Sequence, residues 1–297
     1  MQPCSPGRSL SEDWCTPWWI NLLNFGKALI GCEKPGAIYR HTFSGLLTIA
    51  ALCLLVLITF PGLVGAQGKR RGLETLNPSF QKSVLRGWRY FQTSFADDGV
   101  ACVHCHRDHS DIVPWAGSYP KVQIFDGTPY RVKTLGMVII ETLDTHTDLE
   151  PSQRGEMAED LLAYIAWWGD GQPSAPGISV NGMTPEEDLA ELREAVSRGR
   201  SLFNRREPTS CINCHTAGDQ HDNYRKSLKD VFLGFPRSDG TGERTVSLDA
   251  YLLNHYRSQG VVMSGGSITD IAAYLADLSR GKLQRPGTRQ TGGNLTP

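Results

Sequence analysis

Two five-residue stretches carry the residues that are most able to do chemistry. "CVHCH" runs from Cys102 to His106 and "CINCH" runs from Cys211 to His215, so each holds two thiols and one imidazole in the order C-x-x-C-H. This pattern is typical of covalent haem c attachment, in which both thiols add to one edge of the porphyrin and the adjacent imidazole binds the iron. The sequence therefore predicts two covalently attached haem c groups. The predicted attachment residues are Cys102, Cys105, Cys211 and Cys214, and the predicted iron ligands beside them are His106 and His215.

Other uses of a C-x-x-C pair fit the sequence less well. A thioredoxin-type redox couple does not need the following histidine and belongs in a βαβ context, whereas this chain shows little strand pattern. A single Cys4 zinc site would have to join two pairs separated by the 105 residues between Cys105 and Cys211. A disulfide within either pair would be strained.

The sequence around the motifs repeats itself. His106 precedes Tyr164 by 58 residues, and His215 precedes Tyr274 by 59. The repeated pieces are "RGWRYF" (86–91) and "LLAYIA" (161–166) in the first half, and "RGRSLF" (198–203) and "IAAYLA" (271–276) in the second. We infer an internal duplication whose period is too long for a solenoid repeat, so it predicts two domains of one kind.

Each half is expected to be mostly helical. Met157, Leu161, Tyr164, Ile165 and Trp168 recur at helical spacing and form one apolar face. The predicted divisions are an N-terminal extension of unknown role at 1–42, a signal peptide or membrane anchor at 43–66, a first domain at 78–170, a linker at 171–183, a second domain at 184–282 and a disordered tail at 283–297.

Over about 78–282 the chain resembles dihaem c-type cytochromes built from two class I cytochrome c domains. The resemblance implies an all-α fold of two tandem domains behind an N-terminal apolar helix, with aromatic residues packed where the first and last helices of each domain cross. The first half is specifically similar to sulfur-oxidising dihaem cytochromes and thiosulfate dehydrogenases, through Tyr119-Pro120 and Thr134-Leu135. In that group a cysteine of the "TL" helix typically ligates the first haem. The corresponding place lies near Thr142 and has no cysteine, so activity on thiosulfate by that chemistry is not expected.

The second half offers Met263 as the remaining iron ligand. It stands in "SQGVVMSGGSITD", just before the last predicted helix, which is where class I cytochromes place a methionine ligand. Its alternative role is core packing, which methionine also performs readily. His255 is a rival that falls inside a predicted helix, and His221 lies too near the motif.

In the first half, the sequence does not settle the second iron ligand. The candidates are His146, Met137 and Met157, and the iron could also have no second protein ligand. Leu135, Val138, Ile139, Thr142, Leu143 and His146 form a helical stripe, so His146 is expected to point inward. Met137 lies off that stripe, and Met157 is more simply a core residue of the last helix. His104 and His109 flank the motif and are expected to face solvent.

An apolar run at 43–66 predicts export. The stretch Leu46 to Phe60 carries no charge, and Val64 to Ala66 offers a V-x-A cleavage site. Cleavage after Ala66 would leave a soluble periplasmic protein, whereas retention would anchor it in the cytoplasmic membrane through 43–60. The basic "KRR" at 69–71 favours cleavage, because it would otherwise lie outside. A buried soluble helix is the remaining alternative.

Composition narrows the function further. The 297 residues are 40% apolar and 21% charged with a net charge of −1, so nothing in bulk charge points to nucleic acid. The preferred interpretation is an exported electron carrier that exchanges single electrons with donor and acceptor proteins in the periplasm. The alternatives are a haem oxidoreductase acting on a sulfur compound or peroxide at the first haem, with the second as electron outlet, or a membrane-held subunit of a respiratory complex.

Overall fold

The computed structural model describes residues 68–97, 99–124, 131–179, 183–207, 210–218 and 226–288. The N-terminal extension and the apolar run at 43–66 lie outside these ranges, so the expectations of export or anchoring stay predictions. Within the described ranges no helix is long and apolar enough to span a bilayer. Ala66–Pro297 forms one compact unit by itself.

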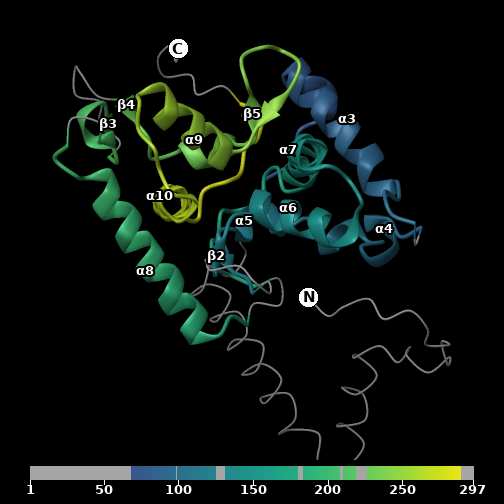
Figure 1. The fold of residues 1–297 in the computed structure, drawn as a ribbon, viewed down its shortest axis with the longest axis horizontal. Helices are drawn as coiled ribbons and strands as arrows, with labels where there is room; N and C mark the ends of the chain where they lie inside the picture. Colours follow the sequence, from purple (N-terminus) through teal and green to yellow (C-terminus); the bar gives the residue numbers. More distant parts are fainter. Residues whose placement is uncertain are drawn as a thin grey trace, which may run out of the picture. The chain divides into compact units, whose positions relative to one another are not determined.

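The described chain is mostly helical, as predicted, and its strands are only two residues long (Figure 1). The first half contains α3 (Pro78–Gln92), α4 (Cys102–Cys105), α5 (Trp115–Ser118), the antiparallel pair β1 (Lys121–Val122) and β2 (Val132–Lys133), α6 (Leu135–His146) and α7 (Pro151–Trp168). The second half contains α8 (Glu186–Phe203), the parallel pair β3 (His215–Thr216) and β4 (Lys226–Ser227), the antiparallel pair β5 (Arg237–Ser238) and β6 (Thr245–Val246), α9 (Leu248–Ser258) and α10 (Gly265–Leu278).

Each half is organised around one close helix crossing, between α3 and α7 and between α8 and α10. At the first crossing a β-carbon on Gly87 would overlap the carbonyl oxygen of Asp160 and lie 2.9 Å from Cβ of Tyr164. At the second, a β-carbon on Gly199 would overlap the carbonyl oxygen of Asp270. Only glycine allows the two backbones to approach this closely.

The same side-chain contacts flank both crossings. The Phe91 and Tyr164 rings lie 5.4 Å apart between centroids, and the Phe203 and Tyr274 rings lie 5.5 Å apart. These pairs confirm the expected aromatic packing, and aromatic pairs of this kind stabilise a core beyond the area they bury. Arg86 pairs with Asp160 and Arg198 pairs with Asp270, at 2.6 and 2.8 Å. The duplication seen in sequence is therefore also a duplication of contacts.

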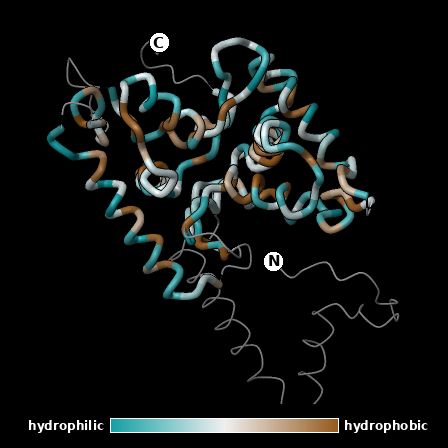
Figure 2. The backbone as a smooth tube through the Cα atoms, in the orientation of Figure 1, coloured by the Kyte–Doolittle hydropathy of each residue, from teal (hydrophilic) through white to brown (hydrophobic). Residues whose placement is uncertain are grey.

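Apolar residues at helical spacing form the two hydrophobic cores. Along α8, hydrophobic and hydrophilic positions alternate around the helix, and the buried residues fall on one face (Figure 2). The first core gathers Phe80, Val84, Phe91, Ile112, Val138, Leu143, Met157, Leu161 and Tyr164 among others. The second gathers Val231, Phe235, Leu248, Leu252, Tyr256, Ile268, Ile271 and Leu275 among others.

The segments predicted as a linker and as a disordered tail pair with each other. Pro173 and Leu283 form an antiparallel bridge, and the Ser174 amide donates to the Lys282 carbonyl at 2.7 Å. Gln284 is only 3% exposed. The tail that was predicted to be disordered is therefore ordered at 283–288, and the predicted linker is held by the same contacts at 171–179. Their Gly- and Pro-rich composition reflects tight turns whose polar backbone groups satisfy one another.

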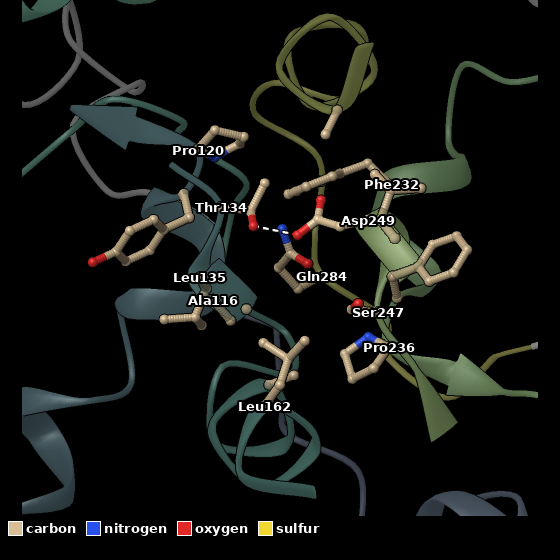
Figure 3. Close-up of a pocket in the computed structure, with 16 residues that line it drawn as sticks. Ala116, Pro120, Thr134, Leu135, Leu162, Phe232, Pro236, Ser247, Asp249 and Gln284 are labelled. Carbon is tan, nitrogen blue, oxygen red and sulfur yellow. Dashed lines mark hydrogen bonds between the residues drawn. The ribbon is translucent and has the colours of Figure 1, made fainter. Parts of the chain in front are cut away.

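A cavity of about 60 Å³ lies where the two halves meet, and the N-termini of α6 and α9 contribute to its wall (Figure 3). The Thr134 hydroxyl caps α6 and donates to the Asp249 carboxylate. The Ser247 hydroxyl caps α9 and donates to Glu159 at 2.7 Å. Burial raises the pKa of Glu159 to about 7 and the pKa of Asp249 to about 6.

The crossings predict opposite effects for two kinds of glycine substitution. Gly87→Ala or Gly199→Ala should each lower the free energy of unfolding by about 1–3 kcal/mol, because the added methyl overlaps a helix backbone. Gly155→Ala is the matched control, since its methyl meets nothing within 4 Å on α7. It should raise stability by about 0.5–1 kcal/mol. Urea unfolding followed by circular dichroism measures all three, and equal stability for Gly87→Ala and Gly155→Ala would contradict the account.

The buried carboxyls predict a loss of stability as pH rises. The unfolded chain releases these protons near the ordinary pKa values of 4.5 and 3.8, whereas the folded protein holds them until about pH 7 and 6. Between those limits the folded state binds more protons, so the free energy of unfolding falls with increasing pH. The double variant Glu159→Gln, Asp249→Asn should flatten this dependence and add roughly 1–3 kcal/mol near pH 8.

The control is Glu187→Gln, which changes an exposed carboxylate in the first turn of α8. It should leave the pH dependence of unfolding as in the wild type. A double variant that keeps the wild-type slope between pH 4 and pH 7 would show that these two groups do not carry the effect.

Candidate functional site

The first motif forms the short helix α4, which begins at Cys102. The amide of His106 donates to the Cys102 carbonyl at 3.0 Å, so the two cysteines occupy one helical turn with the histidine directly after it. Cys102 packs against the first core together with Val103. Cys105 is disulfide-bonded in this structure, and its sulfur would have to be a free thiol before it could form a thioether.

The second motif folds as a single 3₁₀ turn, Cys211–Asn213. Cys211 is half-buried against the second core, and its sulfur lies 2.9 Å from the Tyr256 hydroxyl. Cys214 is exposed, and both residues carry free thiols. Burial raises the pKa of the Cys211 thiol, as it does for Cys102 in the first motif.

Both motif histidines are half-buried. The ring of His106 stands edge-on to Trp115, with centroids 4.9 Å apart. Burial lowers the pKa of His106 and of His215, although Asp111 opposes the effect at His106. A lowered pKa favours the neutral imidazole, which is the state that ligates metals.

His215 has two further features. Its Nδ1 atom is buried without a hydrogen-bond partner. Its ring lies 6.2 Å, between centroids, from the ring of His255 on α9. Two thiols on one turn, a neutral imidazole and an unpartnered ring nitrogen fit the donor set that haem c requires. Among the described residues no three His, Cys, Asp or Glu side chains converge as a site for a metal ion.

The methionines that the sequence offers as second iron ligands lie in different surroundings. Met263 is half-buried against the second core, which also receives Cys211. Met157 is buried in the first core. Met137 lies at the contact between the halves, where its sulfur accepts a hydrogen bond from the Thr269 hydroxyl at 3.3 Å.

His146 does not belong to the buried face of α6, and its role as an iron ligand stays a prediction. The buried part of α6 comprises Leu135, Gly136, Val138, Ile139 and Leu143. His146 is the last residue of the helix and is exposed. The buried face of α6 ends at Leu143, three residues before the end of the helix.

The flanking histidines also differ from each other. His104 is exposed, as expected, and its Nδ1 accepts a hydrogen bond from the Ala101 amide. His109 was expected to face solvent, but it is half-buried. Its Nε2 lies 2.9 Å from the Tyr164 hydroxyl and its ring stacks on Trp168 at 4.2 Å. His221 lies outside the described residues.

Comparison with known proteins bears on the fold. No family model matches the sequence, and no curated protein matches it. Among solved structures, the crystal structure of SoxXA from P. pantotrophus is similar over 72% of this chain and 79% of that chain, with 19% sequence identity and a TM-score of 0.54. At this identity the likeness shows the fold alone, and that fold is cytochrome c-like.

Proposed function

We propose that this protein is an exported dihaem cytochrome c that carries single electrons between redox proteins in the periplasm. One observation carries the proposal: each half places its own C-x-x-C-H motif against a core built on the same helix crossing. The cytochrome c-like fold agrees with it.

The chain's own residues would hold one haem in each half. Cys102 and Cys105 would attach the first, and Cys211 and Cys214 the second. His106 and His215 would bind the two irons. When bound, haem supplies reversible one-electron chemistry at iron.

The surroundings of these residues suit electron transfer. Burial lowers the pKa of His106 and of His215, which favours the neutral imidazole that iron would bind. A second strong ligand on each iron would leave no position for substrate, and Met263 is the residue that its place before α10 suggests for the second half. Donor and acceptor are proposed to be redox proteins, reached after export directed by the segment at 43–66.

The alternative function is a haem oxidoreductase that acts on a sulfur compound or peroxide in the first half. It gains support from the positions of the predicted ligands there. His146 is exposed, and Met137 contacts Thr269 of the other half. The two proposals differ in whether small molecules reach the first iron, and carbon monoxide added to the reduced protein distinguishes them.

The haem content follows directly from the two motifs. Protein matured in an exporting host should carry two haem additions, one on the peptide with Cys102 and Cys105 and one on the peptide with Cys211 and Cys214. The double variant Cys211→Ala, Cys214→Ala should lose one addition and keep the other, because each half has its own core. Peptide mass spectrometry measures this, and a wild-type protein with one haem or none would rule out the proposal.

A further inference from the structure

We propose that His255 is the second protein ligand of the iron bound by His215, so that the haem of the second half lies between two imidazoles. The inference rests on the proposed function, in that it requires a haem c at Cys211 and Cys214. It replaces Met263, which is half-buried against the second core.

The separation of the two rings is the first argument. A metal–nitrogen bond is about 2.0–2.1 Å long. The nitrogen of an imidazole lies roughly 1.1 Å from the ring centre, given ring bonds of about 1.33 Å. Two imidazoles on opposite sides of one iron therefore have centres about 6.3 Å apart. The centres of the His215 and His255 rings lie 6.2 Å apart, with 59° between the ring planes, and this separation matches that of two imidazoles on one metal ion.

The docking of α9 is the second argument. Tyr256, the next residue along the helix, places its hydroxyl 2.9 Å from the sulfur of Cys211. Tyr256 and Leu252 are buried in the second core, so this end of α9 is fixed against the motif. Two successive residues of one helix thus approach the first cysteine and the histidine of the same motif.

The ring of His255 is also held without using its nitrogens. It stacks on Tyr251, one turn earlier, with centroids 6.1 Å apart and 12° between the planes. Arg237 covers Tyr251 at 4.1 Å and so fixes that side chain in turn. His255 is an exposed residue of α9, and within the described ranges no hydrogen bond or ion pair engages its imidazole. A positioned imidazole whose nitrogens are not engaged is thus available as a ligand.

The two halves differ at this position. Thr134 caps α6 and Ser247 caps α9, and the eighth residue after each cap is Thr142 and His255 respectively. The Thr142 hydroxyl donates to the Val138 carbonyl of its own helix at 2.7 Å. The duplicated helices therefore offer an imidazole at this position in the second half only, and the two haem centres are expected to differ in their second ligand.

The test uses the full-length protein loaded with haem. The ferric protein is examined by optical absorption and by electron paramagnetic resonance, which separate imidazole-ligated, methionine-ligated and high-spin haem. His255→Ala should convert one of the two haems to the high-spin form. His255→Met should keep that haem low-spin, add the methionine charge-transfer band and raise its potential, since methionine ligation raises haem potentials. Met263→Ala should leave both haems low-spin, because on this account His255 and not Met263 binds the second iron.

Asn254→Ala is the matched control, because it changes the exposed neighbour of His255 on α9 and should alter neither spectrum. If Met263→Ala alters one haem while the His255 variants leave both unchanged, Met263 is the ligand and the inference is overturned. If His255→Ala fails to accumulate, His255→Met decides, and its failure to add the methionine band to the spectrum counts against the inference. Peptide mass spectrometry distinguishes failure of this inference from failure of the proposed function. Absence of haem from Cys211 and Cys214 in the wild type overturns the proposed function itself.

Discussion

Each half of the protein depends on a backbone contact between a glycine and the carbonyl oxygen of the helix that crosses it. Gly87 meets Asp160 in this way, and Gly199 meets Asp270. Because no side chain separates the helices, the paired aromatic rings and the arginine–aspartate pairs can close around the crossing. The rest of each half, including the turn that carries the two cysteines, packs against the core that this crossing creates.

The duplication gives two similar sites but not two identical ones. The halves meet at a cavity whose walls include the capped starts of α6 and α9, with Asp249 and Glu159 buried nearby. From these equivalent starts the two helices lead to different residues, Thr142 in one half and His255 in the other. Two centres with different second ligands would differ in potential, which would give a direction to electron flow between them.

Local, repeated patterns made the two motifs and much of the helical fold predictable from the sequence. The motifs, the glycine-containing helices and the apolar face ending at Trp168 all lie within one helix or one turn. Contacts between distant segments could not be predicted in the same way. The pairing of Pro173 with Leu283 joins residues that composition alone marks as loop. Helical periodicity put His146 on the apolar face of α6, but periodicity does not show that the buried positions end at Leu143. The position of His255 inside a predicted helix argued against it as a ligand, although α9 docks beside the motif.

The central claim is that the chain holds two haem centres, each of which accepts and releases one electron. Anaerobic potentiometric titration of the full-length protein, followed by haem absorbance, tests it most directly. The account predicts two one-electron steps, each with a slope of about 59 mV per tenfold change in the ratio of oxidised to reduced haem. A single one-electron step, or a haem that does not exchange electrons reversibly, would contradict it.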